Sequence, residues 1–236
     1  MSFAAFFERA RTEAERYGPD PWVFVRELLQ NARDAGATRV ELVAEVGEGV
    51  TRVRCLDDGQ GMSFEHASDY LFTLYRSSKE SDASSVGKFG VGFWSILRFA
   101  PERITIRSHQ SGHDPWEVTL EEGSPRAAQR RPEMARGTEL VLERSGEDRE
   151  VLRRLRDAAV QNGRYLTQRD HPGQALTVTV QGEVINESFV LPAPNASFAW
   201  RGVRGVVALG DAEVHGKRLA HASRHWRQPV GRRLLG

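Results

Sequence analysis

The chain has 236 residues, of which 39% are hydrophobic and 28% are charged, and its formal net charge at pH 7 is +1. These values are typical of a globular protein with one large domain, or one domain and part of another, and they exclude a largely disordered chain. The near-zero net charge gives no argument for binding to nucleic acid or to an acidic membrane surface. The single cysteine, Cys55, excludes an internal disulfide framework and a cysteine-rich metal site.

No apolar run in the sequence approaches the length of a membrane-spanning helix. The N-terminal residues, M-S-F-A-A-F-F-E-R-A-R, have charges within one or two turns of the apolar residues and do not resemble a secretory signal. The sequence therefore predicts a reducing, cytoplasmic location and no association with a membrane.

Two helices are expected in the first 36 residues. Residues 2–17 have apolar side chains at helical spacing, and the turn G-P-D-P ends this segment. Asp20 and Pro21 then suit the N-cap and the first turn of a second helix. Gly36 is a credible end for that helix, because glycine readily adopts the backbone conformation that follows a last helical turn.

The second helix contains R-E-L-L-Q-N-A-R-D-A-G-A, residues 26–37, and has polar residues along one face. Glu27, Asn31 and Asp34 fall at i, i+4 and i+7, within a narrow arc. A carboxylate and a carboxamide one turn apart suit joint action on a metal ion or a water molecule. An ordinary amphipathic helix with a solvated polar face has the same pattern, and this stretch alone does not distinguish the two.

Two strands are expected next, over residues 40–46 and 51–57. In the second strand Val53, Cys55 and Asp57 share one face by alternation. A desolvated carboxylate is costly unless a donor satisfies it, so Asp57 requires a partner. The strand leads into D-D-G-Q-G-M, whose glycines let the backbone turn and approach a ligand closely, although a plain Asp-Gly turn has the same sequence.

A glycine cluster lies further along the chain. Ser63 is expected to cap a helix that extends to about Tyr75, and a serine-rich polar loop follows over residues 76–85. This loop is either simply solvated or a mobile cover over a site. It ends in G-K-F-G-V-G-F and a short apolar helix through Phe99. Glycines before a helix can direct several N–H groups at one anion, but the spacing matches neither a dinucleotide-binding fingerprint nor a P-loop.

Further strands are expected over residues 103–108, 116–120 and 138–142, and an amphipathic helix over residues 147–166. After residue 170 the composition changes. A hairpin is expected over residues 175–186, followed by a proline-rich linker and the strand-like segment V-R-G-V-V-A-L. We therefore expect one domain over residues 1–170, and the beginning of a second over residues 171–236.

Four segments occur in a recognisable order, E-L-L-Q-N-A-R-D-A, D-D-G-Q-G-M, G-K-F-G-V-G-F and G-T-E-L. Together they resemble the GHKL ATPases, the group named for gyrase, the ninety-kilodalton heat-shock chaperone, histidine kinases and MutL, over about residues 1–166. The segment R-E-L-L-Q-N-A-R-D-A, the methionine after the second box and the phenylalanine in G-V-G-F are most similar to the chaperone. A histidine kinase would normally have a phospho-accepting helix pair upstream, and no histidine precedes Glu27.

The resemblance implies a fold, the Bergerat ATP-binding fold. This is an α/β (α+β) two-layer sandwich in which helices cover one face of a mixed, mostly antiparallel sheet, with ATP between the helices and a lid. By the same resemblance, residues 1–170 are the ATP-binding domain. Residues 171–236 would hold the hairpin, the linker and the beginning of a transducer-like domain.

The resemblance also implies roles for individual residues. Asn31 looks like the ligand of Mg²⁺, Glu27 like the general base that orients the attacking water, and Asp57 like the acceptor of the adenine amino group. Asp34 lies near the nucleotide in relatives, but it could equally be a charge on the helix surface. The remaining matched positions are Ala35 near the nucleotide, Gly61 and Met62 in the adenine pocket, Thr138 supporting Asp57, and Gly87, Lys88, Gly90, Val91, Gly92 and Phe93 along the phosphates.

We therefore expect a slow, Mg²⁺-dependent ATPase of a chaperone-like or molecular-switch protein that binds ATP and ADP, closes a lid and forms a homodimer when ATP binds. The sequence does not identify the side chain that supplies a positive charge to the γ-phosphate. Candidates by position are Arg204, Lys217 and Arg218. One alternative is a nucleotide-sensing module that does not hydrolyse ATP. Another is a DNA-processing ATPase like MutL or gyrase. Only the basic tail R-H-W-R-Q-P-V-G-R-R favours this alternative, so nucleic acid is not expected as a partner. The sequence identifies no client or partner protein.

Overall fold

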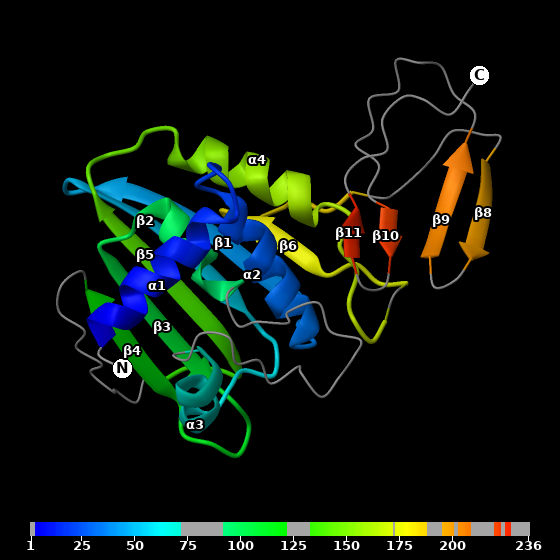
Figure 1. Ribbon diagram of the computed structural model, residues 1–236. Helices are drawn as coiled ribbons and strands as arrows, with labels where there is room; N and C mark the ends of the chain where they lie inside the picture. Colours follow the sequence, from blue (N-terminus) through cyan, green and yellow to red (C-terminus); the bar gives the residue numbers. More distant parts are fainter. Residues whose placement is uncertain are drawn as a thin grey trace. The chain divides into compact units, whose positions relative to one another are not determined.

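A seven-stranded sheet organises the first part of the chain (Figure 1). The computed structural model describes residues 3–71, 92–121, 133–171, 173–187, 195–200, 203–208, 220–222 and 225–227. The strand order is β4-β3-β5-β2-β1-β6-β7, and neighbouring strands are antiparallel except for the parallel pair β1 and β6. The strands are β1 (Arg39–Gly47), β2 (Val50–Asp57), β3 (Arg103–His109), β4 (Trp116–Glu121), β5 (Gly137–Ser145), β6 (Thr177–Val180) and β7 (Glu183–Val184).

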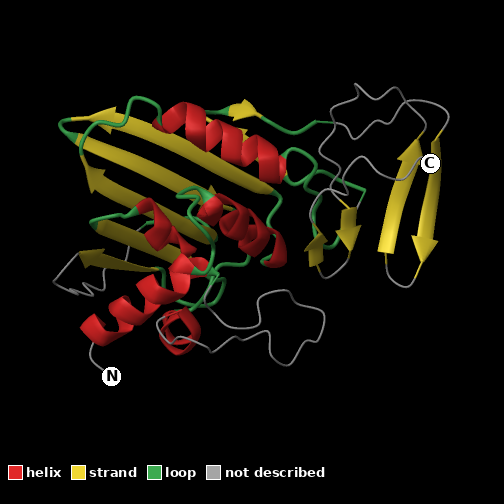
Figure 2. Ribbon diagram, turned by 45° about the horizontal axis from the view of Figure 1, so that its top comes forward, coloured by secondary structure: helices red, strands yellow, loops and turns green. Residues whose placement is uncertain are grey.

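Helices cover one face of this sheet, as Figures 1 and 2 show from two directions. They are α1 (Phe3–Glu15), α2 (Val23–Asp34), α3 (Phe64–His66), the π-helix η1 (Ala67–Leu71), the 3-10 helix η3 (Phe93–Phe99) and α4 (Val151–Gly163). The expected two-layer α/β sandwich with a mixed, mostly antiparallel sheet is therefore confirmed.

The core lies between the helices and the sheet, where antiparallel register aligns apolar side chains in rows across five strands. The strands alternate buried and more exposed residues, so every second side chain faces the helices. Two such rows are buried, Leu42–Cys55–Leu140–Ile106–Val118 and Ala44–Val53–Leu142–Ile104–Leu120.

Helix α2 packs on this core through five buried side chains, Phe24, Val25, Leu28, Leu29 and Ala32. The expected N-cap at Asp20 is wrong, because α2 begins at Val23 and its N-cap position is Trp22, where no side chain caps the helix. Asp20 Oδ1 instead accepts the N–H of Trp22 at 2.9 Å, in the turn that leads into α2. At the other end Gly36 has φ +70° and the N–H of Ala37 bonds to the carbonyl of Ala32 at 3.0 Å. The expected end of this helix at Gly36 is therefore confirmed, while its N-cap position lies two residues after the expected one.

Most of the remaining expected elements are confirmed, with small shifts at their ends. Ser63 caps α3 by accepting the N–H of His66 at 3.2 Å. The segment after the glycine cluster is helical through Phe99, but it is a 3-10 helix. The end of the helix expected at Tyr75 and the serine-rich loop lie outside the described residues. Among the described residues, no helix is long and apolar enough to cross a membrane.

The hairpin expected over residues 175–186 is formed by β6 and β7, and it belongs to the first sheet. Arg39 to Leu42 of β1 pair in parallel with Thr177 to Val180 of β6, and Val178 and Val180 are fully buried. The sheet thus extends past residue 170. The chain divides into two compact units, of which the first ends at Glu187, and we propose that the domain boundary lies there.

The second unit contains a four-stranded sheet in the order β11-β10-β9-β8. Its strands are β8 (Asn195–Trp200), β9 (Val203–Ala208), β10 (Ala220–Ala222) and β11 (His225–Arg227), all antiparallel to their neighbours. The strand expected for V-R-G-V-V-A-L corresponds to β9. Arg204 lies in β9, while Lys217 and Arg218 lie outside the described residues.

Candidate functional site

Polar side chains occupy one row on the helix-covered face of the sheet, next to the two apolar rows. Cross-strand register aligns Val40, Asp57, Thr138, Ser108 and Trp116 in this order. We call Asp57, Thr138 and Ser108 the polar row. Because a buried polar group is costly without partners, the contacts of these three residues indicate what the row can do.

Asp57 ends β2 and continues its buried face, as the alternation of Val53 and Cys55 predicts. Its Oδ1 accepts the N–H of Gly59 at 2.9 Å, and the main chain of Thr138 donates a second hydrogen bond. Burial nevertheless raises the pKa of Asp57 to about 6, against the effect of these two bonds. The carboxylate therefore still gains from a further donor.

Asp58, the next residue, is bound differently. Its carboxylate accepts the N–H of Thr38 at 2.7 Å and that of Arg39 at 2.8 Å, and it also accepts the Thr38 hydroxyl. Burial opposes ionisation, but these bonds outweigh it and lower the pKa of Asp58. Asp58 thus holds the end of β2 against the start of β1, and Asp57 is the carboxylate available to a ligand.

Ser108 connects the polar row to the loop after β2. Its hydroxyl accepts the N–H of Met62 at 3.0 Å, donates to the carbonyl of Gly137 at 3.0 Å and lies 3.0 Å from the hydroxyl of Thr138. The indole N–H of Trp116 donates to the carbonyl of Met62 at 2.8 Å. The Met62 main chain is therefore fixed on both sides.

Two glycines allow the close approach of main chains around this row. Gly61 has φ +66°, and a Cβ there would lie 2.1 Å from the carbonyl oxygen of His109. Gly137 has φ +139°, and its Cβ would lie 2.0 Å from the carbonyl oxygen of Asp57. A side chain at either position would clash with main-chain atoms, so the polar row requires glycine at both.

Helix α2 contacts the loop after β2 through its last turn. The N–H of Gln60 donates to the carbonyl of Ala35 at 2.9 Å. A Cβ on Gly59 would lie 2.9 Å from the Cβ of Ala35 and 2.8 Å from Oδ1 of Asp57. Ala35, Gly59 and Asp57 therefore meet at one point, which joins the end of α2 to the polar row.

The first half of α2 contacts the end of the glycine cluster. A Cβ on Gly92 would lie 2.7 Å from Oε2 of Glu27 and 3.5 Å from the hydroxyl of Tyr17. The other oxygen of Glu27, Oε1, accepts two hydrogen bonds from Arg26, at 3.0 Å from Nε and at 2.6 Å from a terminal nitrogen. One carboxylate oxygen is thus held by Arg26, and the other faces the backbone of Gly92.

Tyr17 adds a neutral hydroxyl to this cluster. Burial, with a further contribution from the charge of Glu27, raises the pKa of Tyr17 to about 12. The phenol therefore stays protonated at neutral pH and can donate a hydrogen bond beside Glu27.

Asn31 lies one turn after Glu27 and one turn before Ala35, between the two contacts of α2. It is exposed, and its side chain makes no hydrogen bond to any other residue that the structure describes. Asp34 is placed differently, because its Oδ1 accepts a hydrogen bond from Gln30 at 2.9 Å and its carbonyl accepts one from Arg169 at 2.8 Å. Asn31 is therefore better placed than Asp34 to reach a ligand.

The structure thus brings together most of the expected site residues along one face of α2. Glu27 lies at Gly92, while Ala35 lies at the loop of Asp57 and Gly59.

The other expected site residues lie elsewhere. Phe93 packs edge-on against Trp94, with 5.3 Å between ring centroids. Gly61, Met62 and Thr138 surround the polar row, and Gly87, Lys88, Gly90 and Val91 lie outside the described residues.

Sequence reasoning did not single out Ser108, Trp116, Arg26 or Tyr17. A usable signal was present for Ser108, which continues the buried alternation of Ile104 and Ile106, just as Asp57 continues that of its own strand. Nothing in the local sequence marks the other three residues, because their contacts depend on segments distant in the chain.

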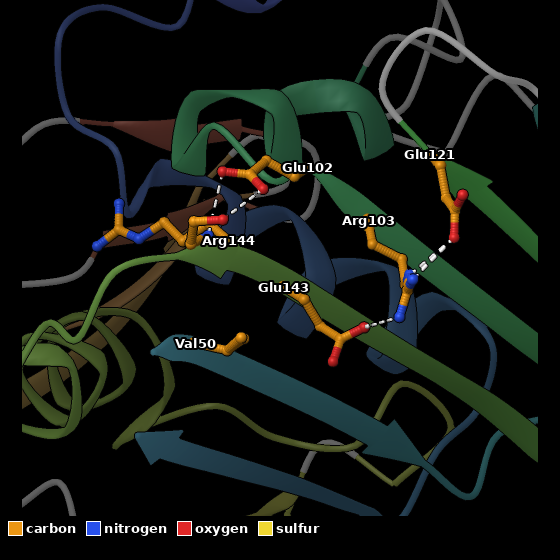
Figure 3. Close-up of a pocket in the computed structure, with 7 residues that line it drawn as sticks. Val50, Glu102, Arg103, Glu121, Glu143 and Arg144 are labelled. Atoms are coloured by element: carbon orange, nitrogen blue, oxygen red, sulfur yellow. Dashed lines mark hydrogen bonds and ion pairs between the residues drawn. The ribbon is translucent and has the colours of Figure 1, made fainter. Parts of the chain in front are cut away.

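The opposite face of the sheet is also polar, but its charges pair with one another. Two rows of alternating glutamate and arginine cross strands β1, β2, β5, β3 and β4, and we call them the ionic rows. Figure 3 shows one end of the second row, where Arg103 reaches both Glu121 and Glu143 beside a depression of about 480 Å³. The rows are Glu41–Arg54–Glu139–Arg107–Glu117 and Glu45–Arg52–Glu143–Arg103–Glu121.

A comparison with known families shows what the segment around this site is similar to. Residues 20–124 match the model of the family described as histidine kinase-, DNA gyrase B- and HSP90-like ATPases. The matched segment contains α2 with Glu27 and Asn31, the polar-row residue Asp57 and the end of the glycine cluster at Gly92. Residues 20–124 are thus similar to the ATPase domains of this family, in agreement with the resemblance of the four sequence segments.

Among curated proteins, the chain is similar to the chaperone protein HtpG of several bacteria. It is 34% identical to HtpG of Bordetella avium over 175 residues, which is 57% of this chain and 27% of that protein. It is 32% identical to an Escherichia coli HtpG over 159 residues, 53% of this chain and 25% of that protein. It is 27% identical to HtpG of Shewanella halifaxensis over 160 residues, 54% of this chain and 25% of that protein. The chain thus spans about a quarter of the length of the relatives that it matches.

Proposed function

We propose that this domain binds ATP with Mg²⁺ and hydrolyses it slowly, as the nucleotide switch of a chaperone-like protein. The observation that carries the proposal is the arrangement along α2. This one helix face begins at the contact of Glu27 with Gly92 and ends at the contact of Ala35 with the loop of Asp57. With a rise of about 1.5 Å per residue, the separation of eight positions between Glu27 and Ala35 corresponds to about 12 Å. An extended nucleotide can lie along such a face, with its purine at Asp57 and its phosphates at Gly92.

Asp57 is the proposed acceptor for the adenine amino group, which supplies the further donor that its carboxylate lacks. Thr138 supports Asp57 through its main chain, while Ala35, Gly61 and Met62 form the surrounding wall. Because the Met62 main chain is fixed by Ser108 and Trp116, this end of the pocket is rigid before the ligand arrives. Rigidity lowers the ordering cost of binding.

Mg²⁺ is the proposed metal, with the carboxamide oxygen of Asn31 as its protein ligand. Within the described residues no group of three histidine, cysteine, aspartate or glutamate side chains could hold a metal by itself. A single exposed amide oxygen agrees with the habit of Mg²⁺, which takes few protein ligands and completes its shell with phosphate oxygens and water. When bound, the ion neutralises charge on the phosphates.

Glu27 is the proposed general base. Arg26 holds one of its oxygens, which fixes the orientation of the carboxylate, and the other oxygen is directed at Gly92. A water molecule between this oxygen and a phosphate would be oriented for attack, and its proton would move to Glu27. Positioning of this kind accounts for most of the catalysis in phosphoryl transfer. Gly92 and Phe93, with the expected Lys88, Gly90 and Val91, are the proposed phosphate-binding segment.

The similarity to HtpG supports the chaperone-like assignment over a DNA-processing ATPase. We further propose lid closure over bound ATP, a homodimer in the ATP state and a cytoplasmic location, which the single buried cysteine suits. A following domain is the proposed source of the γ-phosphate cation.

The test of this proposal is ADP release at saturating ATP and Mg²⁺, measured for the wild type and for Glu27→Ala. We expect wild-type turnover that requires Mg²⁺, and a loss of roughly a hundredfold or more in the variant with ATP binding retained. Arg153→Ala, an exposed substitution on α4, is the matched control. Unchanged turnover in Glu27→Ala would exclude Glu27 as the base. ATP binding without turnover in the wild type would instead favour the nucleotide-sensing module.

A further inference from the structure

The proposed mechanism gives no role to the side-chain hydroxyl of Tyr17. Tyr17 lies in the turn that ends α1, where its N–H donates to the carbonyl of Ala14 at 3.1 Å and so fixes the main chain. The side chain is half-buried, and its hydroxyl makes no hydrogen bond to any other residue that the structure describes. A hydroxyl that is partly removed from water gains from a hydrogen-bonding partner, so this group is a candidate for contact with a ligand.

The position of Gly92 shows what this hydroxyl can reach. A Cβ on Gly92 would lie 3.5 Å from the hydroxyl oxygen of Tyr17 and 2.7 Å from Oε2 of Glu27. The two oxygens therefore face the same side of Gly92, at the end of the glycine cluster. A ligand that reaches Gly92 from this side meets both side chains.

The two side chains offer opposite hydrogen-bonding groups. Oε2 of Glu27 is an acceptor, while Oε1 already accepts two hydrogen bonds from Arg26, at 3.0 Å and 2.6 Å. Burial, with the charge of Glu27, raises the pKa of Tyr17 to about 12, so the phenol keeps its proton at neutral pH. The positive charge of Arg26 is thus engaged on one oxygen of Glu27, and Tyr17 supplies a donor beside the other.

The position beside Glu27 suits one particular phosphate of the nucleotide. In the proposed site the phosphates lie at Gly92, and Glu27 orients the water that attacks the terminal phosphate. The γ-phosphate of ATP therefore lies next to Glu27, where the two negative groups repel each other. A neutral donor stabilises a phosphate at this place, because hydrogen bonds to an ionised acceptor are stronger than those between neutral groups. ADP has no phosphate at this position.

We propose that Tyr17 recognises the γ-phosphate, to which its hydroxyl donates a hydrogen bond on the side of Gly92 that Glu27 also faces. The inference rests on the proposed nucleotide site and adds a residue to it. This residue comes from the turn that ends α1, outside the four sequence segments. Tyr17 thereby contributes to the affinity for ATP and not to the affinity for ADP.

Removal of the hydroxyl tests this role without removal of the aromatic ring. Tyr17→Phe keeps the packing of the ring at the end of α1 and deletes only the donor. We expect weaker binding of a nucleoside triphosphate and unchanged binding of the diphosphate. A purely structural role of Tyr17 would weaken both nucleotides equally. The ratio of the two dissociation constants therefore separates recognition of the γ-phosphate from general damage to the site.

The experiment is calorimetric titration of ADP and of adenylyl imidodiphosphate, each with Mg²⁺, into the wild type and Tyr17→Phe. The imidodiphosphate has a γ-phosphate that is not hydrolysed during the titration. In the variant we expect its dissociation constant to rise about tenfold relative to that of ADP, the value of roughly one hydrogen bond to a charged group. Retained binding of ADP shows that the variant is folded.

Tyr165→Phe is the matched control. It removes a tyrosine hydroxyl that donates to Oε2 of Glu187 at 3.3 Å, just after the end of α4. This contact involves neither Gly92 nor Glu27. The control should therefore keep the wild-type ratio of the two dissociation constants.

Gly92→Ala gives an independent check if Tyr17→Phe does not fold. Its methyl group would lie 2.7 Å from Oε2 of Glu27, on the side of Gly92 where we propose that the γ-phosphate binds. This variant should also bind the imidodiphosphate less tightly relative to ADP. In the double variant, Tyr17→Phe should add little to Gly92→Ala, since both changes act on the same contact.

The outcomes for the inference and for the proposed function differ. If the wild type binds both nucleotides and the folded Tyr17→Phe variant keeps the wild-type ratio, Tyr17 does not recognise the γ-phosphate, while the nucleotide site stands. Equal losses for ADP and the imidodiphosphate, or an unchanged ratio in Gly92→Ala, would likewise overturn the inference. If the wild type binds neither nucleotide, the proposed function itself is wrong.

Discussion

On the helix-covered face of the sheet, Asp57, Thr138 and Ser108 form a polar row beside apolar rows. The opposite face carries two ionic rows of glutamate and arginine, and Figure 3 shows one end of the second row. The ionic rows are internally satisfied, because every charged side chain in them has at least one partner of opposite sign. The polar row is not, because Asp57 keeps a raised pKa in spite of two donors. The difference teaches that incomplete satisfaction, and not polarity as such, distinguishes the face on which we propose that a ligand binds.

The largest effect is expected where the polar row depends on a close main-chain contact. Gly137→Ala would place a Cβ 2.0 Å from the carbonyl oxygen of Asp57, at a backbone φ of +139°. Neither atom can move without separating β2 from β5, so we expect a loss of about 4 kcal/mol or more in the free energy of unfolding. Urea denaturation measures it.

Gly112→Ala provides the control for that substitution. Gly112 also has a positive φ, +85°, but a Cβ there would meet nothing within 4 Å. Gly112→Ala should therefore lose only about 1 kcal/mol in the free energy of unfolding. A loss of the same size at both positions would contradict the close contact at Gly137.

A smaller effect is expected from the ionisation of Asp57. Its pKa of about 6 in the folded protein lies above the ordinary value of 3.8, so the folded state binds the proton more tightly than the unfolded state. The resulting stabilisation is fully present below pH 4 and is lost as the pH rises through 6. Asp57→Asn does not ionise, so its stability relative to the wild type should rise by about 2–3 kcal/mol between pH 4 and 7.

Urea denaturation at several pH values measures this change, with Asp157→Asn on the exposed surface of α4 as the control. The control should follow the wild-type pH dependence. Parallel pH curves for Asp57→Asn and the wild type would mean that Asp57 is not destabilised by burial, and the distinction between the two faces would then fail.

The smallest effect is expected on the ionic rows. Glu139 accepts hydrogen bonds from Arg54 and Arg107, and these arginines lower the pKa of Glu139 in spite of its burial. Because the side chains of Arg54 and Arg107 are about a third exposed, Glu139→Gln should lose only about 1 kcal/mol of stability at low salt, and less at high salt. Glu150→Gln, which breaks an exposed pair with Arg153, should cause no measurable change.

Urea denaturation of Glu139→Gln and Glu150→Gln at low and high salt measures both losses of stability. A salt-independent loss at Glu139, or a loss of nucleotide binding there, would indicate that the ionic rows also take part in the site.

Much of this arrangement could be predicted from the sequence, because it depends on local alternation. Val53, Cys55 and Asp57 alternate with residues of the other face, and the demand of Asp57 for a donor followed from that pattern alone. Glycine spacing indicated the turns at Gly36 and Gly61. The ordered segments around Glu27, Asp57 and Gly92 indicated the ATPase fold.

Contacts between distant segments could not be predicted in this way. The parallel pairing of β6 with β1 joins residues 39–42 to 177–180, and no local pattern specifies which strand a hairpin will join. The approach of Glu27 to Gly92 likewise depends on how η3 packs against α2. Ser108 is an intermediate case, because its alternation is local but its three partners come from two other segments.

The central claim is that the polar row and α2 form a site for ATP, and calorimetric titration of ATP with Mg²⁺ tests it most directly. The wild type should bind one ATP per chain, and Asp57→Asn should weaken binding by about a hundredfold or more, because a buried acceptor is replaced by a group that also donates. Asp157→Asn should bind as the wild type does. An Asp57→Asn variant that folds and binds ATP with wild-type affinity would contradict the account.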